Sequence, residues 1–354
     1  MNHIILKDME YIIKYIDVEM FKGNTFLITG ANGLLGRYMV ELLMYINNNI
    51  LDKDYCKIFA LSRNEIDLKK KFSRYIDKKY FEIIVQNVED NIYIDDKIDY
   101  IIHAASQANT ESFKIDPVGT LSANTIGTYN LLNFAKRKKI KSFLFLSSGA
   151  VYGDISCAIE PVKENHYYSL NPLNINSCYA EGKKMGENMC YCFYKQFSIP
   201  SKIVRIGHTY GPGINLYDGR VFSDFVRNII NDENLIIRSS GKAKRPFCYI
   251  ADAIVAFYLV LFKGNSGEAY NVVNNNCYVS INELADILVN KVFKEKKLKI
   301  IGKEEDINRA TNKSNLGLTV LDSNKINKLG WIPKISIDEG FKRTVESFYN
   351  NYRK

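Results

Sequence analysis

Short runs rich in β-branched and aromatic residues alternate with longer amphipathic stretches along the first half of the chain. The runs predicted as strands are 25–28, 57–61, 81–85, 100–102 and 142–146. Helical stretches are predicted at 35–46 and at about 118–137. Strands separated by helices imply right-handed crossovers. The pattern therefore predicts an α/β fold with a doubly wound parallel sheet.

The ends of the chain depart from this alternation. Apolar residues near helical spacing predict an amphipathic helix over 4–21, so we expect residues 1–22 to form a helical extension docked on the main body. Beyond about residue 194, Gly and Pro punctuate the pattern, as at Gly211-Pro212-Gly213. We expect a sheet-forming domain at 23–194, and at 195–354 mainly a smaller substrate lobe that crosses back to the sheet.

Composition narrows the possible partners. The formal net charge is +9, but Lys and Arg alternate with acidic residues, which favours solubility over binding to nucleic acid or a membrane surface. The first 20 residues mix apolar and charged side chains and do not resemble a signal peptide. The longest apolar run, 253–262, is too short to span a bilayer. Seven cysteines without metal-ligand spacing predict reduced thiols, no metal and a cytoplasmic protein.

A glycine-rich segment directly follows the first predicted strand and opens a helix. It runs Gly30-Ala31-Asn32-Gly33-Leu34-Leu35-Gly36. The first glycine permits a tight turn, the second lets the backbone approach a pyrophosphate, and the third lets helix and strand pack closely. A helix N-terminus also favours phosphate. The segment therefore predicts that domain 23–194 binds a dinucleotide.

The end of the second predicted strand bears on which dinucleotide is bound. NAD-selective sites usually carry an acidic residue here, whereas this chain has Ser62-Arg63. Ser62 does not repel a 2′-phosphate, and Arg63 could pair with one. Since Arg63 could also stack on adenine, the cofactor is NADP(H) or NAD(H), and the residues favour NADP(H).

A tyrosine and a lysine four residues apart form the candidate catalytic pair. Tyr179 and Lys183 would share one face of a helix. A phenol with a pKa near 10 is a poor base, but the ammonium of Lys183 and an oxidised nicotinamide would stabilise its phenolate. Such a group could remove a proton from a sugar hydroxyl as hydride leaves. Ser148, at the end of another predicted strand, could hydrogen-bond the reacting oxygen.

Taken together, these segments resemble the NAD-dependent epimerase/dehydratase family, which has a Rossmann fold. The resemblance rests on residues 30–36, 99–105, 124–128, 147–153 and 179–183 and extends from about Thr25 to Phe348. It implies that Ser148, Tyr179 and Lys183 are catalytic and that hydride passes reversibly between sugar C4 and the nicotinamide. It further implies the following cofactor-binding set: Gly30, Asn32, Gly33, Leu34, Leu35, Gly36, Ser62, Arg63, Ala104, Ala105, Ser106, Asn124, Tyr179 and Lys183. Asn124 is also expected to hold the geometry of the active-site helix.

The second half of the chain is similar to UDP-glucuronate decarboxylases in the segments that wrap the nucleotide. Residues 217–223 and 244–252 carry this likeness, which implies that Arg220 and Arg245 bind the diphosphate of a nucleotide-diphosphate sugar. The family commonly has asparagine where this chain has His208. His208 could contact phosphate, act as an extra acid, or serve as a neutral hydrogen-bonding replacement, and the last interpretation is favoured.

The reaction depends on the two residues after Ser148. Related 4,6-dehydratases have an Asp-Glu pair there and related decarboxylases keep the glutamate, whereas this chain has Gly149-Ala150. A methyl group cannot perform acid–base chemistry, so the leading hypothesis is a nucleotide-sugar epimerase acting through a 4-keto intermediate.

The sequence also leaves other reactions as alternatives. The alternatives are an NADPH-dependent 4-ketoreductase, a decarboxylase or dehydratase relative that lacks the usual pair, and, least favoured, a non-catalytic dinucleotide sensor. The family resemblance implies a homodimer formed through a four-helix bundle.

Overall fold

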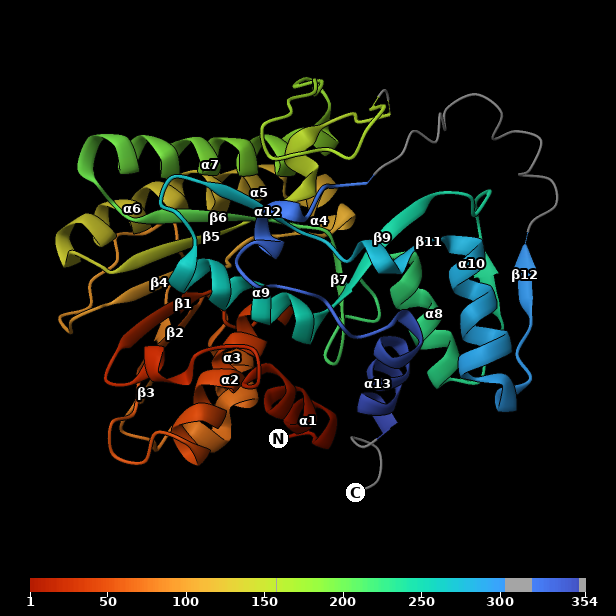
Figure 1. The fold of residues 1–354 in the computed structure, drawn as a ribbon, viewed down its shortest axis with the longest axis horizontal. Coiled ribbons are helices and arrows are strands. Elements are labelled where there is room, and N and C mark those ends of the chain that lie inside the picture. Colours follow the sequence, from red (N-terminus) through yellow and green to blue (C-terminus); the bar gives the residue numbers. More distant parts are fainter. Residues whose placement is uncertain (157, 303–319, 350–354) are drawn as a thin grey trace.

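A seven-stranded parallel sheet lies at the centre of the computed structural model, which describes residues 1–156, 158–302 and 320–349 (Figure 1). The spatial order is β3-β2-β1-β4-β5-β6-β10, and every neighbouring pair is parallel. The strands are β1 (Thr25–Thr29), β2 (Lys57–Ser62), β3 (Phe81–Val85), β4 (Tyr100–His103), β5 (Ser142–Ser148), β6 (Ser201–Ile206) and β10 (Ala269–Val272). The strand order reverses between β1 and β4, where open α/β sheets bind ligands. The predicted doubly wound parallel sheet is confirmed.

Helices cover both faces of this sheet (Figure 1). On one face lie α5 (Pro117–Asn124), α6 (Ile126–Lys138) and α7 (Cys178–Phe197), and on the other lie α2 (Leu34–Asn49), α3 (Glu65–Phe72) and α9 (Ile250–Lys263). Side chains of a strand alternate between the faces. In β1, Phe26 and Ile28 accordingly join one buried apolar cluster, while Leu27 joins the other. Burial on both faces explains why the strands are apolar throughout.

Two predicted helices prove shorter than the hydrophobic pattern suggested. The helix predicted over 4–21 is observed as α1 (His3–Ile12), and Asp17 caps a separate 3-10 turn at Val18–Phe21 by accepting from the Glu19 amide. The helix predicted over 118–137 is divided at Thr125 into α5 and α6. At this division the Thr125 hydroxyl donates to the Leu121 carbonyl at 2.9 Å.

The N-terminal helix is docked through a buried carboxylate. Asp8 is fully buried and accepts the hydroxyls of Tyr38 at 2.8 Å and Tyr249 at 2.7 Å, together with Nη1 of Arg343 at 2.8 Å. These partners come from α2, from the strand β9 (Lys244–Tyr249) and from α13 (Ile337–Tyr349). Helix α1 thus connects the central domain to the second half of the chain.

The second half builds a lobe beside the carboxyl edge of the sheet (Figure 1). A three-stranded sheet contains β7 (His208–Tyr210), β9 and β11 (Tyr278–Ser280), and a two-stranded sheet contains β8 (Leu235–Ile237) and β12 (Ile300–Gly302). The further helices are α4 (Thr110–Ile115), which precedes α5 in the first half, and α8 (Val221–Ile230), α10 (Ile281–Asp286) and α12 (Asn324–Asn327). Strand β10 returns to the central sheet beside β6. Within the predicted lobe, residues 303–319 and 350–354 lie outside the described residues, and the domain boundaries stay predictions.

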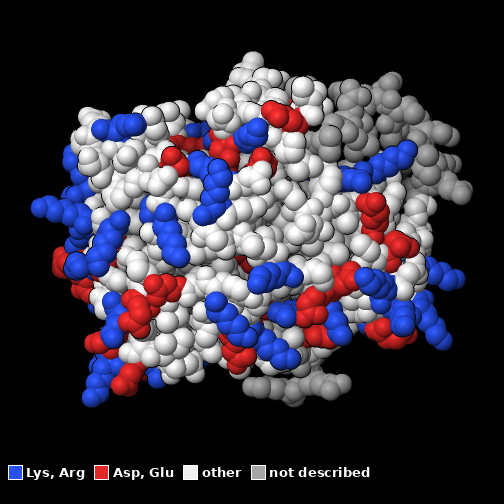
Figure 2. Space-filling model, viewed as in Figure 1, with Lys and Arg blue, Asp and Glu red and all other residues white. Residues whose placement is uncertain are grey.

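Charged side chains are mixed on the face shown in Figure 2, where basic residues are dispersed and acidic residues lie among them. This agrees with the interleaving of charges along the sequence. Within residues 1–156, 158–302 and 320–349, no helix is both long enough and apolar enough to cross a membrane.

Candidate active site

Two glycines let the loop after β1 approach backbone atoms that a side chain would displace. A Cβ on Gly30, whose φ is +65°, would lie 2.6 Å from the amide nitrogen of Ala105. A Cβ on Gly36 would lie 2.3 Å from the carbonyl oxygen of Gly30. Helix α2 begins directly after Gly33, and no side chain in the described part of the chain caps its first turn. The amides of that turn therefore remain available for an anion such as pyrophosphate.

A cavity of about 180 Å³ opens beside this loop, at the carboxyl ends of β1, β2, β3 and β4. Predicted cofactor residues that line it are Gly30, Asn32, Gly33, Ser62, Arg63, Ala104, Ala105 and Ser106. The buried oxygens Asn32 Oδ1 and Ser106 Oγ have no hydrogen-bond partner among the described residues. The glycine cradle, the uncapped helix and these unpaired oxygens fit a dinucleotide.

Sequence reasoning missed part of this cavity. Its remaining lining residues are Leu61, Gln86, Asn87, Val88, Glu89, Gln107 and Ala123. The segment from Gln86 to Glu89 directly follows β3. Because ligands of open α/β sheets bind outside the carboxyl ends of the strands, the predicted end of this strand was a signal that could have identified the segment.

Ser148, Tyr179 and Lys183 meet beyond the carboxyl end of β5. Ser148 is the last residue of β5, and its side chain lies close enough to the phenol of Tyr179 to lower the pKa of that phenol. The Tyr179 ring stacks on Phe113 with centroids 5.2 Å apart. Lys183 Nζ lies 5.8 Å from the Tyr179 ring centroid and donates to the Leu146 carbonyl at 2.6 Å. The structure thus brings the predicted catalytic residues together.

The surroundings shift both titrating groups of this set. Burial raises the pKa of Tyr179, while the Ser148 hydrogen bond and the charge of Arg220 lower it. Burial lowers the pKa of Lys183 to about 7, against the opposing influence of the Glu187 carboxylate. Lys183 is only 2% exposed, so its ammonium is sensitive to nearby charge.

Asn124 is the last residue of α5 and faces α7, and it is not among the residues that line the cavity. It is fully buried and its amide nitrogen donates to the Thr120 carbonyl at 2.7 Å. A Cβ on Gly182 would approach Asn124 Cβ to 3.2 Å, and one on Gly186 would approach the Asn124 carbonyl oxygen to 2.9 Å. Asn124 therefore packs against the helix that carries the catalytic pair, and its predicted part in cofactor binding stays a prediction.

Three predicted substrate residues converge from separate elements. His208 begins β7, Arg245 lies on the neighbouring strand β9, and Arg220 immediately precedes α8. Burial and the positive charges of Arg245 and Arg220 lower the pKa of His208 to about 3. The imidazole is therefore neutral at pH 7, while the two guanidinium groups favour an anion beside it. The part that His208 plays in substrate binding stays a prediction.

The two guanidinium groups are held differently. Arg220 donates through Nε to Asp218 Oδ2 at 2.7 Å, and Asp218 is 6% exposed. Arg245 Nη1 donates to the Lys244 carbonyl at 2.9 Å. Arg220 thus has a buried counter-ion that fixes its direction, whereas Arg245 keeps more of its donors for a ligand.

The turn after Ser148 carries no acid. Gly149 and Ala150 begin a 3-10 turn in which the Ala150 amide donates to Ser148 Oγ at 3.2 Å. Leu321 faces this turn, because a Cβ on Gly149 would lie 3.0 Å from its Cδ1. The methyl group of Ala150 is exposed where the dehydratase-like and decarboxylase-like patterns require a carboxylate.

Residues 26–274 match the model of the NAD dependent epimerase/dehydratase family. The chain belongs to this family. It is therefore an enzyme, as the sequence motifs indicated, and the family to which it belongs is NAD-dependent. This family member is similar to UDP-glucuronic acid decarboxylase 3 of Arabidopsis thaliana, at 30% identity over 91% of this chain and 88% of the relative. It is equally similar to UDP-glucuronic acid decarboxylase 1 of Xenopus tropicalis, at 30% identity over 91% and 71%.

Solved structures with the same fold include enzymes of other reactions. The crystal structure of UDP-glucose 4-epimerase from Thermotoga maritima with UDP-glucose has a TM-score of 0.76 at 23% identity and covers 93% of this chain and 100% of that one. UDP-glucuronic acid 4-epimerase from Bacillus cereus, in complex with UDP-glucuronic acid and NAD, has a TM-score of 0.74 at 21% identity, with the same coverage. At these identities the likeness establishes the fold alone.

Proposed function

We propose that this family member is a nucleotide-sugar 4-epimerase that acts on a UDP-linked sugar through a 4-keto intermediate. The observation that carries the proposal is that Ser148, Tyr179 and Lys183 are all present, while Ala150, two residues after Ser148, has no acid–base group. Epimerisation at C4 needs only these three residues and a pocket in which the keto sugar can turn. The preference for UDP draws on the similarity to UDP-glucuronic acid decarboxylases.

Each residue of the set has a distinct part in this reaction. NAD, when bound in the cradle above, supplies the group that accepts hydride from sugar C4 and returns it. Tyr179 as phenolate removes the proton of the C4 hydroxyl and gives it back after the sugar has turned. Ser148 hydrogen-bonds both the phenol and the reacting oxygen. Lys183 holds positive charge beside the ring and favours the phenolate.

The arginines of the second-half lobe would hold the nucleotide while the keto sugar turns over in the pocket. The guanidinium groups of Arg220 and Arg245 suit diphosphate oxygens, and neutral His208 offers one donor and one acceptor. Binding energy from the diphosphate keeps the 4-keto sugar on the enzyme while its ring presents the other face.

A panel of UDP-, CDP-, GDP- and dTDP-sugars tests the proposal. Purified enzyme with NAD or NADP is incubated with each sugar, and products are separated by chromatography and weighed by mass spectrometry. We expect a UDP-sugar isomer of unchanged mass without net conversion of the cofactor. If the products instead have lost carbon dioxide or water, the epimerase assignment is wrong and the decarboxylase or dehydratase alternative replaces it.

A second candidate, an NADPH-dependent 4-ketoreductase, is favoured by the rim of the cofactor cavity. Ser62 and Arg63 line this rim, and neither would repel a 2′-phosphate. Stoichiometric loss of NADPH absorbance at 340 nm with a nucleotide-4-keto sugar would support this candidate. Absence of turnover with keto sugars would remove it.

We further propose a homodimer formed through a four-helix bundle, to which each subunit contributes α7 and the helix that Thr125 divides into α5 and α6. Large apolar side chains are exposed on these helices, namely Val118, Leu121, Ile126, Tyr129 and Met185. Exposed apolar side chains that gather on one surface mark association sites. Light scattering after size exclusion should give twice the chain mass, and Tyr129→Glu should give the monomer. A wild-type monomer at micromolar concentration would contradict the dimer.

A further inference from the structure

A buried carboxylate stands behind the catalytic set, and the proposed reaction does not use it. Glu187 lies on α7 one turn beyond Lys183 and is 9% exposed. Its oxygens accept the Ser147 hydroxyl at 2.5 Å and the Nε and Nη2 groups of Arg205 at 3.0 and 2.7 Å. Ser147 and Arg205 are paired across β5 and β6. One carboxylate therefore joins α7 to the ends of both strands.

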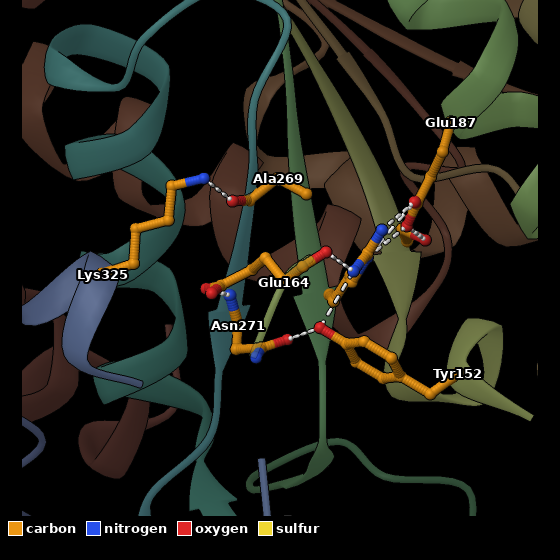
Figure 3. Close-up of polar contacts among 8 residues, drawn as sticks. Tyr152, Glu164, Glu187, Ala269, Asn271 and Lys325 are labelled. Carbon is orange, nitrogen blue, oxygen red and sulfur yellow. Dashed lines mark hydrogen bonds and ion pairs between the residues drawn. The ribbon is translucent and has the colours of Figure 1, made fainter. Parts of the chain in front are cut away.

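Arg205 extends this contact to the turn beyond Ser148. Its Nη1 donates to the Tyr152 hydroxyl and to the Glu164 carbonyl, both at 2.9 Å. The Tyr152 hydroxyl donates to Asn271 Oδ1 at 2.7 Å, and Figure 3 shows these side chains meeting between the strands. We call Ser147, Tyr152, Glu187, Arg205 and Asn271 the Glu187 network. The network makes hydrogen bonds to Ser147, immediately before Ser148, and to Tyr152, at the end of the turn that follows Ser148.

We propose that Glu187 is a positioning residue for the reaction: it holds Ser148 in register with Tyr179 and maintains the positive charge of Lys183 without touching substrate or cofactor. Tyr179, Lys183 and Glu187 follow one another at four-residue intervals, so they share a face of α7. The Ser147 bond fixes that face against the strand end that carries Ser148. This inference rests on the proposed function, because it requires Ser148, Tyr179 and Lys183 to be the reacting set.

The groups around Lys183 give Glu187 its electrostatic part. Those that face the ammonium are Tyr179, Glu187 and Cys190 from α7, His103 from β4, and the Leu146 carbonyl from β5. Glu187 is the carboxylate among them, and its charge raises the pKa that burial lowers. Removing this charge lowers the pKa of Lys183 below its present value of about 7. The alkaline limit of activity should therefore move to lower pH.

Two variants of the network and one matched control separate positioning from general stability. Glu187→Gln keeps the shape but leaves the cation of Arg205 buried without its counter-ion, which can prevent folding. Ser147→Ala removes one hydrogen bond and leaves the ion pair intact. Asp8→Asn is the control, because Asp8 is also buried and paired with an arginine, Arg343, but lies on α1.

The first readout needs no substrate. Lysines labelled with ¹³C at Cε report the pKa of each ammonium by NMR, and Lys183→Met assigns the Lys183 signal. Lys202 serves as an internal reference, because burial alone lowers its pKa to about 8. We expect Glu187→Gln to lower the pKa of Lys183 and leave that of Lys202 unchanged, while Asp8→Asn moves neither.

The second readout is steady-state turnover of UDP-glucose and UDP-glucuronic acid. Hydrogen bonds to charged groups are strong enough that Ser147→Ala should lower kcat roughly tenfold, and Glu187→Gln by more, with KM unchanged. Asp8→Asn should keep the wild-type kcat.

If Glu187→Gln folds and the pKa of Lys183 does not move, the inference is overturned. A wild-type kcat in Ser147→Ala overturns it as well. If Glu187→Gln does not fold, the kcat of Ser147→Ala decides by itself. If neither sugar is turned over by the wild type, the NMR titration decides, together with amide exchange at residues 146–152, which should accelerate in Ser147→Ala. Full turnover in Tyr179→Phe would instead refute the proposed function and leave the NMR result standing.

Discussion

The two sides of the active site are built in different ways. On the proposed cofactor side, Gly30 and Gly36 matter because they lack side chains, and the amides at the start of α2 are the candidate anion site. On the proposed substrate side, the candidate groups are the side chains of Arg220, Arg245 and His208, which three separate elements bring together. A site made of backbone is local in sequence, whereas a site made of converging side chains depends on how distant segments pack. The catalytic set joins the two, since α7 and the end of β5 lie between them.

The largest effect should come from the catalytic set that connects the two sides. Tyr179→Phe removes the hydroxyl that we propose exchanges a proton with the sugar, so kcat should fall by about 10³-fold while both binding sites persist. Stopped-flow absorbance at 340 nm with a UDP-sugar, together with titration of UDP and NAD, would measure this. If the variant turned over at the wild-type rate, the phenol would have no part in the chemistry.

The backbone character of the cofactor side can be tested by adding a single methyl group. Gly30→Ala forces Cβ into the Ala105 amide at a φ of +65°, and NAD affinity should fall by roughly 100-fold. Gly23→Ala is the matched control, since Gly23 has a φ of +64° and a Cβ there would meet nothing within 4 Å. This control should lose about 1 kcal/mol of stability and bind NAD normally. Equal NAD affinity in both variants would show that the close approach is unimportant.

The side-chain character of the substrate side predicts a smaller, graded effect. Arg245→Gln should weaken UDP binding roughly tenfold, as expected for loss of charge-assisted hydrogen bonds, with kcat changed less than KM. Arg227→Gln provides the comparison, because Arg227 already pairs with Asp224 and bonds the Leu216 carbonyl. Isothermal titration with UDP measures both variants, and an undiminished affinity in Arg245→Gln would move the diphosphate site elsewhere.

The smallest expected effect is the pH dependence of stability caused by His208. Its pKa is about 3 in the folded enzyme and about 6.5 when unfolded, so between these values the unfolded chain binds a proton that the native state does not. The free energy of unfolding should therefore decrease as pH falls below 6.5. Urea denaturation at pH 7.5 and pH 5.5 should show wild type losing about 1 kcal/mol more than His208→Gln. Equal losses would mean that His208 becomes protonated in the folded enzyme.

Local patterns predicted much of the fold and the chemistry. The β-branched runs identified strands of the central sheet, and Gly30 to Gly36 marked the cofactor loop. The four-residue spacing of Tyr179 and Lys183 placed both on one helical face. These features depend on neighbours within a few residues, so the order of residues along the chain was sufficient to identify them.

Long-range contacts decided the rest. The hydrophobic pattern could not reveal that Glu187 would meet Arg205. That pairing depends on the register of β5 against β6 and on burial that makes an unpaired charge costly. Register and burial arise only when segments distant in sequence pack together. The amino-acid order thus determined the family and the candidate catalytic groups that the chain carries, and tertiary structure decided which other groups surround them.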